Sequence, residues 1–164
     1  MIAKIILQKK PLMAHMLTGT AFDRFELVQC QITTFCSYQI DGTRRADFYE
    51  EGEEKPETAY ALWGEVRPHA LAVIRGKKTP LSFQFVFRLA EKDLPALLKR
   101  AGSGISEADV YGLYINFNFD GKTLIVTTGT SLRGFTPDRS LEHFWDETVL
   151  RFFEKNGIEL TDPE

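Results

Sequence analysis

Alternation of apolar and polar side chains predicts two neighbouring strands in the second half of the chain. Between residues 111 and 119 every second side chain is apolar, and the residues between them are small or polar. This period of two is typical of a strand that buries one face. The Asp-Gly pair at 120–121 favours a tight turn, and the β-branched run over 123–128 favours a second strand. The pattern therefore predicts a β-hairpin, whose apolar face needs a cover.

A long amphipathic helix after this hairpin is predicted to provide the cover. Thr136, Pro137 and Asp138 are typical of a helix start, and Asn156 with Gly157 is typical of a helix end. Between them, apolar side chains recur at helical spacing on one side and charged side chains on the other. The predicted inner face comprises Leu141, Phe144, Trp145, Thr148, Val149 and Phe152, and the predicted outer face comprises Glu142, Asp146, Arg151 and Glu154.

Periodicity predicts further elements on the N-terminal side of the hairpin. Two more strands are expected at residues 2–7 and 81–89, and helices are expected at 11–17, 58–74 and 91–101. In the strand at 81–89, the predicted buried face comprises Leu81, Phe83, Phe85, Phe87 and Leu89.

Two segments leave alternatives open. The β-prone region around residues 25–40 favours one long or bulged strand over two strands with a bend near Thr33 and Thr34, because no Gly, Pro, Asn or Asp marks a turn there. The turn is expected instead at Asp41-Gly42. Pro68 is expected either to kink the helix at 58–74 or to begin a second helix, because proline lacks the N–H that a helix interior needs.

Together these elements predict a single α+β domain over residues 1–164. Hairpin-type connections and one-sided alternation favour two layers: a mostly antiparallel sheet of five or six strands, with about four helices packed mainly on one face. The length of 164 residues fits one domain. The acidic stretch at 47–57 is predicted to be a flexible loop, because its glutamates repel each other and it has little to bury.

Composition narrows the class of protein without indicating an activity. The chain is 43% hydrophobic and 26% charged, and its net charge of −3 gives no whole-chain reason to expect a membrane or nucleic-acid partner. Cys30 and Cys36 have a spacing unlike zinc or redox motifs, and both are expected to be reduced. No secretory signal or run of transmembrane length is visible, so a cytoplasmic protein is expected.

Local motifs for metals, cofactors or catalysis are weak. His15, His69 and His143 lie on separate predicted helices, and only His143 has acidic neighbours, so no metal site is expected. The hydroxyl-rich segment at 127–131 could bind an anion through backbone N–H groups, but it lacks the pattern of a P-loop, and an ordinary turn is favoured. No nucleophile elbow or dinucleotide fingerprint occurs, so no cofactor is expected and an enzyme is disfavoured.

Charge distribution provides the one candidate site. Between residues 67 and 100 there are eight basic and two acidic residues, whereas residues 41–57 carry seven acidic and three basic ones. A near-neutral chain can therefore carry a basic patch, for which Arg67, Arg75, Lys77 and Lys78 are the candidate anion- or nucleic-acid-binding residues.

Two segments resemble a known family. They are residues 76–83 (GKKTPLSF) and residues 127–132 (TTGTSL), the latter running on to the motif at 140–146 (SLEHFWD). Together they are similar to a family of small bacterial proteins classed as a domain of unknown function, over most of the chain. The resemblance implies a bacterial, cytosolic protein. It brings no assigned activity and no functional residues to transfer.

Three hypotheses for function follow. The leading one is a non-catalytic binding or interaction domain whose partner is unknown. The second is a binder of nucleic acid or a phosphate-bearing ligand through the basic patch. The third is an enzyme with an unrecognised site, since catalytic triads assemble in space and not in sequence. The exposed edges of an antiparallel sheet would also allow a homodimer.

Overall fold

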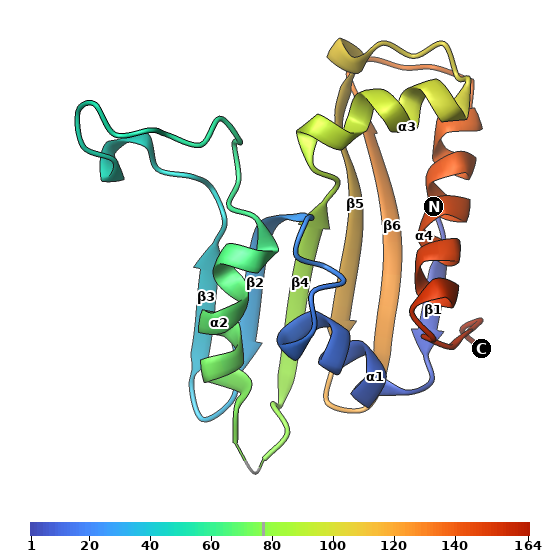
Figure 1. The fold of residues 1–164 in the computed structure, drawn as a ribbon. Coiled ribbons are helices and arrows are strands. Elements are labelled where there is room, and N and C mark those ends of the chain that lie inside the picture. Colours follow the sequence, from blue (N-terminus) through green and yellow to red (C-terminus); the bar gives the residue numbers. More distant parts are fainter. Residues whose placement is uncertain (77) are drawn as a thin grey trace.

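A single antiparallel sheet forms the centre of the molecule (Figure 1). The computed structural model describes residues 1–76 and 78–164, and over these residues it contains seven strands in the order β3-β2-β4-β5-β6-β1-β7, each antiparallel to its neighbours. The strands are β1 (Ala3–Ile6), β2 (Glu26–Thr33), β3 (Ser37–Asp41), β4 (Ser82–Arg88), β5 (Val110–Phe119), β6 (Leu124–Leu132) and β7 (Leu160–Thr161).

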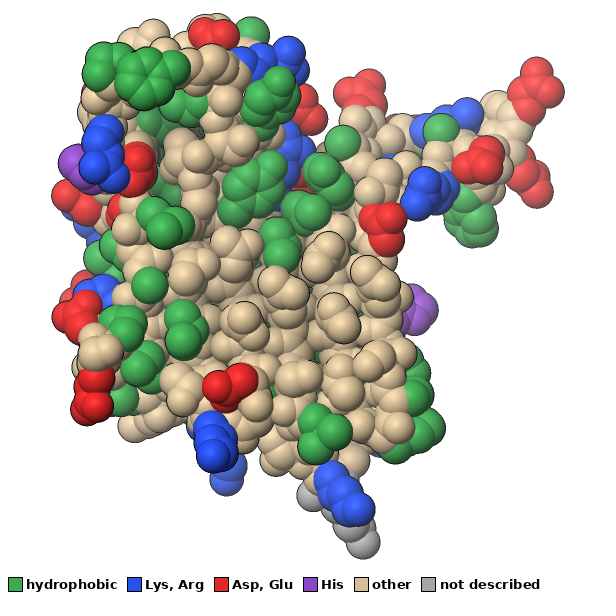
Figure 2. Space-filling view, turned by 180° about the vertical axis from the view of Figure 1, so that it is seen from behind, with side chains coloured by type: hydrophobic (Ala, Val, Ile, Leu, Met, Phe, Trp, Pro, Cys, Tyr) green, Lys and Arg blue, Asp and Glu red, His purple; other side chains and the backbone are tan. Residues whose placement is uncertain are grey.

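Helices cover one face of this sheet, as the sequence predicts. Among the described residues the α-helices are α1 (Lys9–Met13), α2 (Trp63–Ile74), α3 (Leu94–Ala101) and α4 (Ser140–Lys155), and a π-helical turn at Ala14–Thr18 continues α1. In Figure 1, α1, α2 and α4 lie in front of the strands, and α3 crosses near one end of α4. The opposite face is uncovered and mostly neutral (Figure 2). Neutral polar side chains on it include Gln31, Gln84, Asn116, Asn118 and Thr127.

The core lies between the sheet and the helices. Alternate residues of β4 and β5 point into it, which confirms the buried positions predicted at Phe83, Phe85 and Phe87. Trp63 of α2 is also buried, and its Nε1–H donates to the Met16 carbonyl oxygen at 2.6 Å. Trp145 of α4 is buried in the same core. The predicted docking of the C-terminal helix on an antiparallel sheet is therefore confirmed.

The region predicted as one long strand is two strands. β2 and β3 pair through a turn at residues 34–36, where the Thr34 N–H donates to the Cys36 carbonyl oxygen at 2.9 Å. No described residue other than glycine has a positive φ, so this turn needs no Gly, Asn or Asp. The expected bulge also exists: the register of β2 against β4 shifts between Leu27 and Gln29. The split of this region and the two-residue β7 raise the strand count above the five or six expected.

Gly42 has a different role from the turn predicted at Asp41-Gly42. Its N–H donates to the Val28 carbonyl oxygen at 3.0 Å, beside the bulge of β2. A Cβ at this position would lie 1.7 Å from the Leu27 carbonyl oxygen. The glycine therefore allows two backbones to approach closely.

α2 is one helix that begins at Trp63, later than the predicted start at residue 58. The chain before it is extended, because Ala61 exchanges backbone hydrogen bonds with Gly42 and Leu27. Pro68 lies within this single helix and removes the hydrogen bond that its N–H would donate.

α4 begins at Ser140, so Thr136–Asp138 precedes the helix that it was expected to start. The Asp138 carboxylate accepts a hydrogen bond from the Ser140 N–H at 2.9 Å. Asp146, predicted on the outer face, is buried, and its carboxylate accepts a hydrogen bond from the Thr128 hydroxyl.

Leu81, predicted on the buried face of its strand, is exposed because it lies just before β4. The acidic segment at 47–57 is exposed over most of its length and extends away from the sheet (Figure 1), and its flexibility stays a prediction. In the described part of the chain, no helix combines the length and the apolar character needed to cross a membrane.

Candidate functional site: a pocket between α3 and α4

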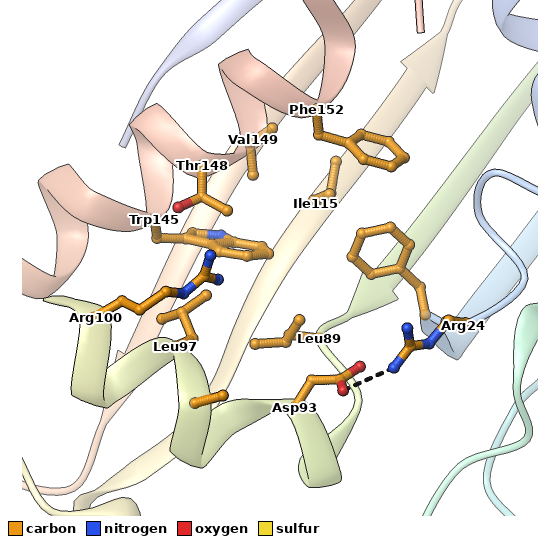
Figure 3. Close-up of a pocket in the computed structure, with 12 residues that line it drawn as sticks. Arg24, Leu89, Asp93, Leu97, Arg100, Ile115, Trp145, Thr148, Val149 and Phe152 are labelled. Atoms are coloured by element: carbon orange, nitrogen blue, oxygen red, sulfur yellow. Dashed lines mark hydrogen bonds and ion pairs between the residues drawn. The ribbon is translucent and has the colours of Figure 1, made fainter. Parts of the chain in front are cut away.

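A pocket of about 270 Å³ opens between α3, α4 and the segment before β2 (Figure 3). Its floor is made by core side chains: Leu97 of α3, Ile115 of β5, and Trp145 and Val149 of α4. Phe152 of α4 and Phe25, just before β2, line the pocket as well. Because these elements are packed into the core, the pocket is built on a rigid frame.

The polar atoms of the pocket wall are already engaged. The Trp145 Nε1–H donates to the Tyr114 carbonyl oxygen at 3.0 Å, which fixes the indole ring. The Thr148 hydroxyl donates to the Phe144 carbonyl oxygen at 2.7 Å, within α4. With these hydrogen bonds made inside the protein, the interior of the pocket offers mainly apolar surface to a ligand.

The mouth of the pocket is charged. The guanidinium of Arg24 pairs with the Asp93 carboxylate at 3.0 Å, and both residues line the opening. Arg100, in the last turn of α3, extends toward the Trp145 ring in Figure 3 and forms no ion pair with any residue that the structure describes. Two arginines and one aspartate leave an excess of positive charge at the mouth, which favours an anionic group there.

This arrangement offers binding groups and lacks the usual parts of a catalytic site. Among its described lining residues there is no histidine, cysteine or serine, and no nucleophile lies beside a base. An apolar interior with an arginine-rich mouth fits a small molecule that has a hydrocarbon body and a negatively charged end.

Comparison with known proteins places the chain in a family. The model of a family of unknown function (DUF5721) matches residues 15–161. The chain belongs to the DUF5721 family. No curated protein and no solved structure matches the chain. Membership confirms the resemblance noted in the sequence, and the DUF5721 family has no assigned function.

In this DUF5721 chain, the residues of the predicted basic patch have different environments. Arg67 forms a bidentate ion pair with Asp23. Its Nε lies 2.8 Å from Oδ1 of Asp23, and its Nη2 lies 3.0 Å from Oδ2. Arg75 and Lys78 are exposed and line one groove at the end of α2. Lys77 lies outside the described residues. Folding adds Lys9 and Lys10, which line a neighbouring groove together with Lys78 and which the sequence reasoning did not include.

A buried carboxylate was also missed by sequence reasoning. Glu26 is fully buried; one of its carboxylate oxygens accepts from Arg88 at 2.9 Å and the other from the Glu91 N–H at 3.2 Å. Burial raises the pKa of Glu26 above its ordinary value, and the neighbouring Arg88 opposes this shift. Burial likewise raises the pKa of Tyr114, which lies on the same face of the sheet. Both carboxylate oxygens of Glu26 are hydrogen-bonded within the fold. The ion pair between Glu26 and Arg88 joins β2 to β4.

The remaining sequence candidates do not form a site. Residues 127–131 lie inside β6 and pair with β5, so the turn favoured there is wrong. The alternative, an anion-binding loop, is wrong as well, because this backbone belongs to the strand ladder. His15, His69 and His143 lie on three separate helical segments, as predicted. Among the described residues no three His, Cys, Asp or Glu side chains are grouped to hold a metal ion. Cys30 and Cys36 are both free thiols.

Proposed function

We propose that this protein is a non-catalytic binding domain that takes a small carboxylate with a hydrocarbon body into the pocket between α3 and α4. The observation that carries the proposal is the combination of an apolar floor, made of core residues, with Arg100 at the mouth, which forms no ion pair with any described residue. The volume of about 270 Å³ lies just below the range of about 300–1,000 Å³ found for drug-sized ligands, so the ligand is small.

Two physical terms support binding of such a ligand. Moving hydrocarbon from water onto the apolar floor contributes roughly 25 cal/mol for each Å² that is buried. At the mouth, the planar guanidinium of Arg100 can donate two parallel hydrogen bonds to one carboxylate, a geometry that lysine does not offer. A neutral ligand would gain binding free energy only from the burial of its hydrocarbon.

The cellular location follows as part of the same proposal. We place the protein in the cytoplasm, where the two free thiols would stay reduced.

Titration calorimetry with octanoate tests the proposal. Octanoate is expected to bind with a Kd of about 1 mM or tighter, given its small size. Arg100→Gln is expected to weaken binding about tenfold, because it removes the charged hydrogen-bond donor. Lys99→Gln is the matched control: it removes the same charge from the neighbouring position of α3, outside the pocket lining, and should leave the Kd unchanged.

Octanol, which has the same chain without the charge, separates the two terms. Octanol is expected to bind to the wild type more weakly than octanoate does. Its Kd is expected to be the same for the wild type and for Arg100→Gln. Absence of octanoate binding, or equal loss in the Arg100 and Lys99 variants, would refute the proposed site.

A further inference from the structure

Two grooves share lining residues around the connection between α2 and β4, away from the pocket between α3 and α4. This connection lies at the lower end of the molecule in Figure 1. One groove has a volume of about 690 Å³ and the other about 520 Å³. They share Ile74, Gly76, Lys78 and Thr79, so they flank the connection between α2 and β4. We call the surface formed by these two grooves the basic end.

The basic end gathers positive charge from two separate parts of the sequence. Lys9 and Lys10 come from α1, and Arg75 and Lys78 come from the end of α2 and the connection after it. Lys9 also lies over the Phe119 ring, with 5.5 Å between its Nζ and the ring centroid. In the part of the chain that the structure describes, no acidic residue lines either groove.

Large apolar side chains stand exposed among these cations. Phe35, in the turn between β2 and β3, is 91% exposed; Leu81 is 66% exposed and Leu7 is 56% exposed. Phe35 and Leu81 line the same groove, and the Leu81 N–H donates to the Thr33 carbonyl oxygen at 2.8 Å. Because this hydrogen bond holds Leu81 beside the end of β2, the side chains of Leu81 and Phe35 lie at the same end of the sheet.

We propose that the basic end docks the protein on the surface of a bilayer that contains anionic lipids. Such a surface offers negative headgroups directly above hydrocarbon, which matches cations that surround exposed phenylalanine and leucine side chains. A nucleic acid would satisfy the lysines and could stack on Phe35, but it would leave Leu7 and Leu81 without a partner. The exposed apolar side chains therefore favour the lipid surface.

The net charge of −3 does not oppose this docking, because the acids are concentrated elsewhere. Seven of them lie in residues 41–57, and this segment forms the arm that carries acidic side chains at the upper right of Figure 2. Phe48 on that arm is exposed as well, but glutamates follow it in the chain. The resulting asymmetry would orient the basic end toward a negative surface and the acidic arm away from it. The expectation of no membrane partner rested on whole-chain charge, which averages over these two ends.

Co-sedimentation with lipid vesicles tests the inference. The full chain is mixed with vesicles of phosphatidylcholine alone and with vesicles of about one-third phosphatidylglycerol, at an ionic strength of about 0.15 M. Binding is expected only to the anionic vesicles. Replacing Lys9, Lys10 and Lys78 by Gln is expected to weaken it about a hundredfold, since each cation near such a surface strengthens binding about fivefold. The matched control replaces Lys55, Lys92 and Lys99 by Gln, which removes the same charge outside the grooves and should preserve binding.

A second variant separates lipid from nucleic acid. Phe35→Ser with Leu81→Ser keeps every charge and is expected to weaken vesicle binding at least tenfold, because it removes the groups that enter the hydrocarbon. Equal binding to neutral and anionic vesicles, no binding to either, or retention of binding by both groove variants would overturn the inference. Tight binding of the protein to single-stranded DNA, without binding to the vesicles, would also overturn the inference. This docking is independent of the carboxylate pocket, whose residues none of these groove variants changes.

Discussion

Glu26 is a charged residue that the fold buries completely, and its carboxyl group makes stability depend on pH. Burial raises the pKa of Glu26, so the folded protein holds this proton more tightly than the unfolded chain does. The contribution of Glu26 to stability is therefore greatest below the ordinary pKa of about 4.5 and declines as the pH rises through the folded pKa. The ion pair with Arg88 reduces this decline without reversing it.

Glu26→Gln removes the titration and keeps the shape of the side chain. As the pH rises from about 4 to 7, the wild type is expected to lose free energy of unfolding relative to this variant, because only the wild type must ionise a buried group. Urea denaturation at several pH values measures the difference. Glu51→Gln, at an exposed position, serves as the control. A wild type that gains stability over Glu26→Gln with rising pH would show that the sign of the shift is wrong.

At the scale of elements, the predictions that succeeded rest on long, regular patterns. The strand β5 and the helix α4 were predictable because their apolar positions repeat over nine or more residues of sequence, and β6 was predictable from the β-branched run at 123–128. The turn between β2 and β3 was not, because it uses Thr34, Phe35 and Cys36 with negative φ and so lacks a sequence signal. The start of α2 was misplaced because Leu62, its N-cap, has no capping side chain, and tertiary hydrogen bonds hold residues 58–62 extended.

Trp145→Ala tests how strongly α4 is held on the sheet. Trp145 is only 2% exposed, and its removal should lower the free energy of unfolding by about 3–5 kcal/mol, since it leaves a cavity and an unpaired carbonyl oxygen at Tyr114. Chemical denaturation provides the value. Phe135→Ala, at a residue that is almost fully exposed, should change stability little. A denaturation midpoint of Trp145→Ala near that of the wild type would mean that α4 contributes little to the core.

At the scale of the whole molecule, both proposed binding surfaces arise from segments that are distant in sequence. Periodicity identified Trp145 and Phe152 as apolar face positions. The pocket itself exists because α3 and α4 do not fill the space between them, which depends on how the two helices pack. The charge count found Arg75 and Lys78, whereas Lys9 and Lys10 join them only through the fold. The distribution of charge along the chain thus predicted a basic surface, and the fold determined which residues belong to it.

The most direct test of the carboxylate pocket is a map of backbone amide chemical shifts as octanoate is added to the full chain. We expect the largest changes at residues 96–100 of α3 and 145–152 of α4, with a single Kd shared by these positions. Changes confined to Lys9, Lys10 and Lys78, or no saturable change at any amide, would contradict a binding site between α3 and α4.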